Sequence, residues 1–219
     1  YDPVGRLGEE RLADGSSIQH EYDLAGNRTR RVASGGKTTA YFYSRDNRLK
    51  MAGDRWFDYD ANGNRVAELS ADGITEYAYD NENRLVSVIS REASVRFEYG
   101  GDGRRWSTTT ATGSRYYVPV PATAGVLAVV DADAATLVSH IVAHNSIGTQ
   151  EQGDLHYYLY DRAGGDSVAV CDRDGDLVSL VSYNPLGQMQ VVIGDRRPSG
   201  PGYRGGDRDA TTGLVYLNG

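Results

Sequence analysis

The chain has few of the features that indicate a disulfide-bonded, membrane-spanning or nucleic-acid-binding protein. Its 219 residues include a single cysteine, Cys171, so no disulfide can form within the chain. No apolar run approaches the roughly 20 residues that a membrane-spanning helix needs. The formal net charge is −7, whereas a surface that binds nucleic acid is expected to be basic. The length suffices for one large or two small domains.

Phenylalanine is scarce as well. Three phenylalanines stand against 16 tyrosines, and 27 glycines are present. A compact two-sheet sandwich would favour Phe, Leu and Ile in its interior. Tyrosine is apolar along its ring and polar at its tip, which suits a single extended sheet with two partly wet faces. The abundant glycine indicates frequent turns.

A short motif, Tyr-Asp-x-x-Gly-Asn-Arg, recurs at intervals of roughly 20 residues along the first half of the chain. A fixed period of this kind indicates a repeat architecture, in which each copy is one structural unit. Clear copies begin at Tyr1, Tyr22, Tyr59 and Tyr79, and degraded copies begin at Tyr43 and Tyr99.

The clearest copy, between Ile74 and Ile89, predicts two strands joined by a tight turn. Its two arms are rich in β-branched and aromatic residues of period two, and Asp80-Asn-Glu-Asn83 separates them. We therefore predict an all-β fold of antiparallel hairpin repeats that form a continuous curved strip. No helical stripe is evident in the first hundred residues or so. A second turn signal follows each motif, at Asp14-Gly15, Gly35-Gly36, Asp72-Gly73 and Arg91-Glu92.

Each motif residue has an expected part in the turn. Tyrosine ends the incoming strand and sends its hydroxyl to the rim, and aspartate accepts backbone N–H groups two residues on. Glycine or asparagine tolerates positive φ at the fourth turn position. Arginine opens the outgoing strand, where it lies over that tyrosine ring or pairs with the aspartate. We assign these structural parts to Tyr22, Asp23, Gly26, Arg28, Tyr59, Asp60, Gly63, Arg65, Tyr79, Asp80, Asn83, Arg84, Tyr160 and Asp161.

The second half of the chain departs from this period. The motif is absent from Arg115 to about Tyr160, although strand-like runs continue. Residues 145–154 predict a polar loop, Asp172 to Gly175 a hairpin turn, and residues 194–206 an irregular crossover. These changes predict three segments: tyrosine-aspartate repeats over 1–114, an irregular β segment over 115–159 and a further β segment over 160–219.

The last segment carries a more specific resemblance. Its blocks Tyr158-Leu-Tyr-Asp-Arg-Ala-Gly164, Tyr183-Asn-Pro-Leu-Gly187 and Tyr203-Arg-Gly-Gly-Asp-Arg-Asp209 follow the repeats in order and lead to Tyr216. This series resembles the core of the RHS, or YD-repeat, proteins, which include the C components of insecticidal toxin complexes and the teneurins. The resemblance covers essentially the whole chain, with generic repeats to about residue 110 and core blocks from about residue 155.

The resemblance implies a structural role. In this family the repeats spiral into a hollow β-shell that encloses a variable C-terminal toxin, and a self-cleaving aspartyl protease segment lies at the end of the core. Neither catalytic aspartate maps onto this chain, so the chemistry is expected beyond residue 219. We expect the chain to be a segment of a longer polypeptide, cut at both ends. The expected partners are the rest of that polypeptide, its enclosed toxin domain and other toxin-complex or secretion-system components. Secretion or a cell-surface location is expected, with no cofactor.

Two other functions remain open. The first is a surface adhesion module, in which exposed aromatics such as Trp56 and Trp106 bind carbohydrate or a partner protein. The second is a part of the self-cleaving protease itself. As a fragment, the chain would present two unpaired strand edges and is expected to aggregate.

Several side chains invite a catalytic or metal-binding interpretation that the sequence does not favour. His140 and His144 share one face of a strand about 13 Å apart, too far for one metal ion. Cys171 lies in a strand-like run without a nearby histidine and is expected to be a buried strand residue. Aspartates are abundant because turns need them, and Asp172-Arg-Asp-Gly175 lacks the distal ligands of a calcium loop. We therefore assign no catalytic, cofactor or metal residue, including the candidate acids Asp166, Asp172, Asp207 and Asp209.

Overall fold

The fold is all-β, as the sequence predicts. The computed structural model describes residues 1–12, 15–120, 126–142, 146–161, 166–183, 189–194, 207–209 and 211–216, and these residues form strands and turns without a helix. Within them, no helix is long and apolar enough to cross a membrane. The chain divides into two compact units, residues 1–92 and 93–219. The three-segment division at residues 114 and 159 stays a prediction.

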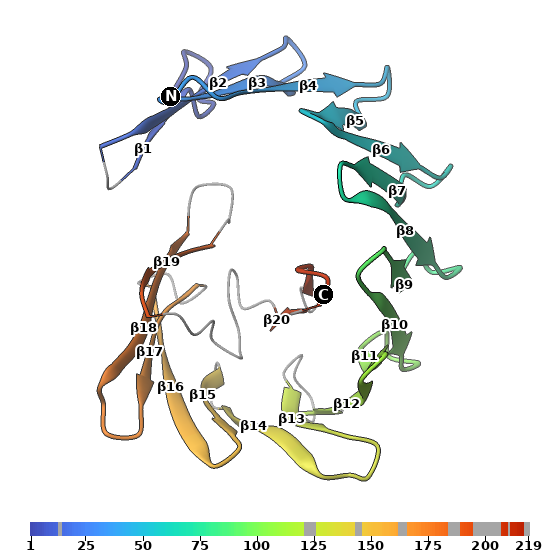
Figure 1. Cartoon of the computed structure of the whole chain (residues 1–219), viewed down its shortest axis with the longest axis vertical. Coiled ribbons are helices and arrows are strands. Elements are labelled where there is room, and N and C mark those ends of the chain that lie inside the picture. Colours follow the sequence, from blue (N-terminus) through green and yellow to red (C-terminus); the bar gives the residue numbers. More distant parts are fainter. Residues whose placement is uncertain are drawn as a thin grey trace. The chain divides into compact units, whose positions relative to one another are not determined.

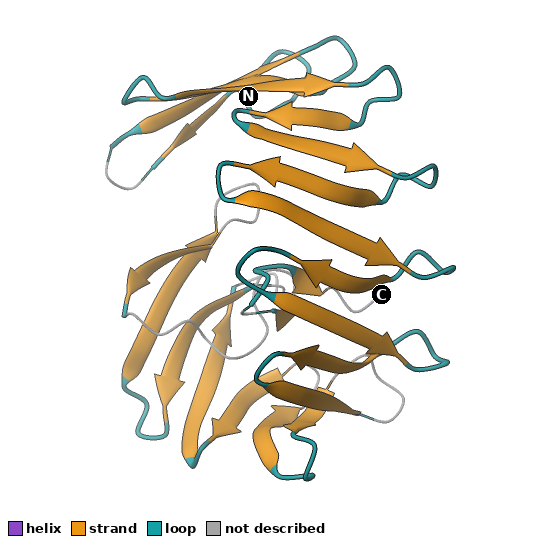
Figure 2. Ribbon diagram, turned by 45° about the vertical axis from the view of Figure 1, so that its right-hand side comes forward, coloured by secondary structure: helices purple, strands orange, loops and turns teal. Residues whose placement is uncertain are grey.

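The first unit is a run of antiparallel hairpins in which each strand pairs with the next along the chain (Figure 1). Figure 2 shows that the connecting loops lie alternately at the two ends of the strands. The strands are β1 (Glu9–Arg11), β2 (Ser17–Tyr22), β3 (Arg28–Ala33), β4 (Thr38–Tyr43), β5 (Leu49–Ala52), β6 (Arg55–Tyr59), β7 (Arg65–Ser70), β8 (Gly73–Tyr79) and β9 (Leu85–Ile89).

The second unit continues the same style and adds a separate short hairpin. Strands β10 to β19 again pair with their sequence neighbours, and β20 pairs with β21. They are β10 (Ser94–Tyr99), β11 (Arg105–Thr110), β12 (Gly113–Pro119), β13 (Val126–Val130), β14 (Thr136–Val142), β15 (Ser146–Glu151), β16 (Asp154–Tyr160), β17 (Ser167–Asp172), β18 (Leu177–Tyr183), β19 (Met189–Ile193), β20 (Asp207–Arg208) and β21 (Val215–Tyr216).

One predicted loop is wrong. Residues 146–151, inside the expected loop at 145–154, form strand β15 between β14 and β16. Thr149 is 1% exposed, and its hydroxyl lies 2.7 Å from that of Tyr158. A polar residue satisfied in this way can occupy a buried strand, so the polarity of the segment did not indicate a loop. The crossover predicted at 194–206 lies largely outside the described residues.

The two faces of the sheet in the first unit differ in character. Phe57 faces Glu68 across the ladder, and Glu68 faces Thr75, so these side chains share one face with Tyr77. We call this the arginine face, because Arg65 packs on it between Phe57 and Tyr77. The opposite, open face carries Trp56, which is 55% exposed. The two faces therefore differ in exposure, because Phe57 and Glu68 on the arginine face are buried whereas Trp56 on the open face is not.

Candidate functional site

The candidate site is the set of Tyr-Asp turns, which we call corners, together with the arginines that follow them. At Asp60 the backbone N–H donates to the Asn64 carbonyl over 2.9 Å, and the Gly63 N–H donates to the Asp60 carbonyl over 3.2 Å. The Asp60 carboxylate accepts the Asn64 backbone N–H at 2.8 Å and its side-chain amide at 2.9 Å. Gly63 has φ +93°. This is a three-residue hairpin loop closed by a bulge, which places the register shift just before Tyr59.

The same geometry recurs at the other corners. Positive φ falls on the fourth turn residue whether it is glycine, as at Gly26, or asparagine, as at Asn47 (φ 59°) and Asn83 (φ 60°). The carboxylates of Asp2, Asp23 and Asp80 also accept N–H groups four residues on. The corner is therefore one repeated device whose geometry tolerates substitution at the fourth position.

These hydrogen bonds favour the ionised carboxylates. The side-chain amide of Asn64 is the largest cause that lowers the pKa of Asp60, and that of Asn27 lowers the pKa of Asp23. For Asp80 the backbone N–H of Arg84 is the largest cause of the lowered pKa. At these three corners the ionised aspartate is thus the favoured acceptor.

The motif tyrosine ties its corner to the preceding one. The hydroxyl of Tyr79 donates to the Arg65 carbonyl over 3.1 Å, and that of Tyr43 donates to the Arg28 carbonyl over the same distance. In each case the acceptor is the first strand residue after the preceding corner. Burial raises the pKa of Tyr43 and of Tyr79, so both hydroxyls keep their proton for this bond. Further copies are Tyr22 to Leu7, Tyr59 to Leu49 and Tyr183 to Ser167.

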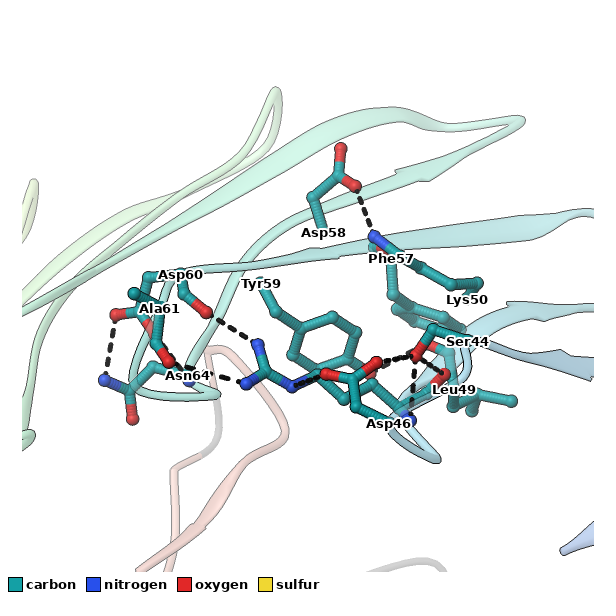
Figure 3. A network of polar contacts seen from close by, with 11 residues as sticks. Ser44, Asp46, Leu49, Lys50, Phe57, Asp58, Tyr59, Asp60, Ala61 and Asn64 are labelled. Carbon is teal, nitrogen blue, oxygen red and sulfur yellow. Dashed lines mark hydrogen bonds and ion pairs between the residues drawn. The ribbon is translucent and has the colours of Figure 1, made fainter.

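The arginines fall into two positions that the motif does not distinguish. In the first position, the arginine follows the corner aspartate by four residues and lies beside the turn. Arg48 is an example, with Ser44 in place of the aspartate. Its guanidinium donates to the carbonyls of Asp60 and Ala61 in the next corner over 2.7 and 3.4 Å and pairs with Asp46 at 2.8 Å. Figure 3 shows this network around the ring of Tyr59. Arg48 therefore joins consecutive corners.

Arginines five residues after the aspartate point instead onto the arginine face. The Arg65 guanidinium carbon lies 4.6 Å from the centre of the Tyr77 ring and 5.5 Å from that of Phe57. Arg28 lies 4.5 Å from the centre of the Tyr41 ring. These rings belong to the following hairpin or to the incoming strand, and none is the tyrosine of the arginine's own corner.

Of the two contacts expected for an arginine with its own corner, the ion pair with the aspartate occurs at two corners, whereas the ring contact is made with a different tyrosine. Arg6 and Arg84 pair with their own aspartates, Asp2 and Asp80, at 2.6 and 2.7 Å. The ring that Arg6 covers, however, is Tyr22 of the next corner.

The corner at Tyr160 and Asp161 is wider than the others. The Asp161 N–H donates to the Asp166 carbonyl, one residue further along than in the earlier corners. Burial raises the pKa of Tyr160 to about 12. The corner at Asp172 keeps the usual size, with the Gly175 N–H bonded to the Asp172 carbonyl, and forms the hairpin turn that the sequence predicts.

The second unit has a corresponding arginine face, on which Arg105 of β11 lies between Phe97 and Tyr117, and the C-terminal hairpin contacts it there. The ring centre of Tyr216 lies 4.6 Å from the Arg105 guanidinium carbon, and the Arg105 backbone N–H donates to the Tyr216 hydroxyl over 3.2 Å. Tyr117 and Phe97 lie 4.5 and 5.9 Å from the same guanidinium. Arg105 is 8% exposed. The sequence gives no local signal for this contact, because its two residues stand 111 positions apart.

The open face of the first unit carries a row of apolar side chains. Successive members face one another across five strands, from β4 to β8. Four of them are about half exposed, at 49 to 58%. The row, which we call the apolar row, spans about 19 Å by the usual strand spacing. Its members are Phe42, Met51, Trp56, Leu69 and Ile74.

Among the described residues, the remaining candidate side chains do not come together in a metal-binding cluster. No group of three or more His, Cys, Asp or Glu side chains that could hold a metal ion occurs in that part of the chain. His140 lies in strand β14, and His144 lies outside the described residues. Asp209 accepts the N–H groups of Thr211 and Thr212 in a turn. Cys171 is half-buried in β17.

Comparisons with known proteins agree with this geometry. The family model "Teneurin YD-shell" matches residues 1–219. The tRNA nuclease WapA of Bacillus subtilis is 28% identical over 99% of this chain, and mouse (Mus musculus) Teneurin-4 is 25% identical over 99%. The match covers 10% of the former and 8% of the latter, so the chain spans about a tenth of the length of these relatives.

A solved structure supports the fold. The Photorhabdus luminescens Tc holotoxin pore superposes with a TM-score of 0.66 at 20% identity, over 93% of this chain and 11% of that one. The match of the family model over every residue, with corners and tyrosine ties repeated along an antiparallel strip, shows that the chain belongs to the teneurin YD-shell family.

Proposed function

We propose that this chain is a wall segment of a YD-repeat shell that encloses a C-terminal toxin or effector of its own polypeptide. The observation that carries the proposal is the contact of Tyr216 with Arg105. It places the C-terminal hairpin of the second unit against the arginine face of its own sheet. A sheet face that receives its own downstream chain is suited to line an enclosed space.

The names of the relatives support a toxin carrier. One is named as a tRNA nuclease and another structure as a toxin pore, and both are about ten times longer than the segment matched here. In this proposal the segment supplies wall and no catalytic group, while any nuclease or autoproteolytic activity belongs to other parts of the polypeptide. The partners are then the rest of the polypeptide and its guest, and the site of action is outside the cell or at its surface.

The test uses the full-length parent protein. Small-angle scattering should give a pair-distance distribution that fits a hollow particle, and its C-terminal domain should resist protease as long as the shell is folded. A solid particle without a cavity would contradict the proposal. Rapid cleavage of the C-terminal domain in the folded parent would contradict it as well.

The apolar row favours a second candidate, an adhesion surface. Because the row lies on the face opposite to Arg65, it remains available when the arginine face lines a cavity. Trp56 lies at the centre of the row, and Trp106 in the second unit is 52% exposed and packs edge-on against Tyr116 at 5.6 Å. Binding to a glycan array that Trp56→Ala abolishes and Trp106→Ala leaves unchanged would assign adhesion to the row.

A further inference from the structure

The contact between Arg105 and Tyr216 has an equivalent position in the first unit. Phe97, Arg105 and Tyr117 form a triad in which two rings flank one guanidinium. Residues of the same types occur forty positions earlier in the chain, at 57, 65 and 77. They form the same triad, at 5.5 and 4.6 Å. We call the two sets the first triad (Phe57, Arg65, Tyr77) and the second triad (Phe97, Arg105, Tyr117).

The two triads differ in occupancy. The second triad holds a third ring, that of Tyr216, and Arg105 is buried. Within the described part of the chain, Arg65 has two ring contacts, and 31% of its side chain stays exposed. Both triads open onto the arginine face of their own unit.

We propose that the first triad is a binding site for a tyrosine side chain carried by an extended segment of the enclosed polypeptide. Arginine is suited to this because its planar guanidinium can stack on an aromatic ring while its edge donates hydrogen bonds. The inference rests on the proposed shell function for the source of the tyrosine. The site itself rests on the equivalence of the two triads.

The positive charge of Arg65 is partly paired within the first triad. Glu68 pairs with Arg65 at 3.3 Å and also with Arg55, and the Tyr77 hydroxyl donates to Glu68 over 3.3 Å. At the corresponding position the second triad has Thr108, whose hydroxyl lies 3.0 Å from that of Tyr117. Glu68 thus shares one negative charge between Arg55 and Arg65, so the Arg65 guanidinium keeps part of its positive charge, which the electron-rich face of an aromatic ring attracts.

The two triads also differ in the tyrosine that bonds to the arginine's backbone, and this difference offers another explanation for the third ring. The Arg65 carbonyl accepts the Tyr79 hydroxyl, and the residue at the corresponding position of the second triad is Pro119, which has no hydroxyl. If Tyr216 only replaces a missing corner tyrosine, the first triad is complete without a ligand. Binding experiments separate these two interpretations.

The probe is a fluorescently labelled peptide with the chain's own sequence 207–216, which ends in tyrosine, titrated into the 219-residue chain and followed by anisotropy. A Tyr216→Ala chain vacates the second triad and calibrates the signal for one such site. The intact chain should bind the peptide through the first triad, and Arg65→Gln should weaken this binding about five-fold or more, which corresponds to one lost stacking contact. A peptide whose tyrosine is replaced by alanine should not bind.

Three controls make the outcome decisive. Arg65→Lys keeps the charge but loses the planar stack, so it should weaken binding as Arg65→Gln does. Arg96→Gln, an exposed strand arginine, should leave binding unchanged, and circular dichroism checks that each variant is folded. The proposal would be overturned if the peptide bound the Tyr216→Ala chain but not the intact chain. It would also be overturned if Arg65→Gln left binding to the intact chain unchanged. Neither result depends on protease protection of the parent, so the shell proposal is tested separately.

Discussion

At the scale of single residues, the motif tyrosine contributes more than its ring. Its hydroxyl reaches back to the carbonyl that follows the preceding corner, over 2.8 to 3.1 Å at Tyr22, Tyr43, Tyr59 and Tyr79. In a strip of hairpins, bonds between side chains and the neighbouring repeat add to the backbone ladder in holding successive hairpins in register. A hydrogen bond between a side chain and the neighbouring repeat supplies such a link once in every turn of the pattern.

Removing this hydroxyl should cost stability without altering packing. Tyr79→Phe leaves the Arg65 carbonyl without its donor and should lower the free energy of unfolding of the first unit by about 1 kcal/mol. Urea titration followed by Trp56 fluorescence in a Trp106→Phe background reports on this unit alone. Tyr41→Phe, whose ring stacks on Arg28 but whose hydroxyl has no described partner, is the matched control and should change little. Equal losses in the two variants would show that the hydroxyl tie contributes nothing.

The choice of residue at the fourth corner position is limited by the positive φ of the backbone and not by the space around the side chain. Gly63 has φ +93°, and the nearest atoms to an added Cβ belong to the flexible Arg48 side chain at 3.7 Å. Gly63→Ala should therefore cost about 1 kcal/mol, because alanine disfavours the left-handed region. Gly63→Asn should cost clearly less, since Asn47 and Asn83 already hold that conformation. Urea midpoints of the two variants, measured as for Tyr79→Phe, should therefore differ, and identical midpoints would contradict the argument.

At the scale of elements, strand β15 shows that a polar segment can be tightly constrained. A Cβ on Gly148 would lie 2.6 Å from the His156 carbonyl oxygen of the paired strand. Thr149 beside it is buried with its hydroxyl satisfied by Tyr158. Among the side chains described in this strand, Thr149 is thus held by a polar contact, and Gly148 lies in close backbone approach to β16.

Gly148→Ala should push β15 and β16 apart. We expect a loss of about 1–3 kcal/mol, as for other overpacked sites. Trp106 fluorescence in a Trp56→Phe background reports on the second unit during urea unfolding. The control is Gly101→Ala, because nothing lies within 4 Å of a Cβ there and φ is not in the left-handed region. A neutral Gly148→Ala would show that the strands separate without cost.

The sequence predicts the elements better than the contacts between them. Period-two arms and Asp-x-x-Gly or Asp-x-x-Asn turns are local signals, so the hairpins of the first unit follow directly from them. Arg84 and Arg65 look alike in the motif, yet a one-residue difference in distance from the aspartate sends one to its own corner and the other to the arginine face. The contact of Arg105 with Tyr216 has no local signal at all, because only the folded chain brings these residues together.

At the scale of the whole molecule, stability depends on the charges of the corner aspartates and of one histidine. We expect the free energy of unfolding to fall in two steps as the pH is lowered. The lowered pKa of Asp2, Asp23, Asp60 and Asp80 means that the folded chain favours their ionised forms. Their contribution is present above the unfolded value near 3.8 and is lost as the pH falls through their lower folded values. This is the second step, below about pH 4.

The first step belongs to His20, which occupies the position of Phe57 and Phe97 in front of its own corner. Burial is the largest cause that lowers its pKa from 6.5, nearby Arg28 and Arg31 add to this, and Glu10 opposes it. Its side chain is 1% exposed and lies 3.9 Å from Glu10. Because the folded state disfavours the protonated imidazole, His20 costs stability as the pH falls below 6.5.

His20→Phe should remove the first step and keep the second. The variant places at this position the residue that the two triads carry there, so its packing is already established elsewhere in the chain. Urea midpoints of the first unit should fall between pH 6.5 and 5 in the unaltered chain, stay level over that range in His20→Phe, and fall below pH 4 in both. Asp60→Asn, which removes one corner charge, should leave the first step in place and weaken the second. If His20→Phe instead kept a decline above pH 5, the loss would come from the surface charges and not from this buried pair.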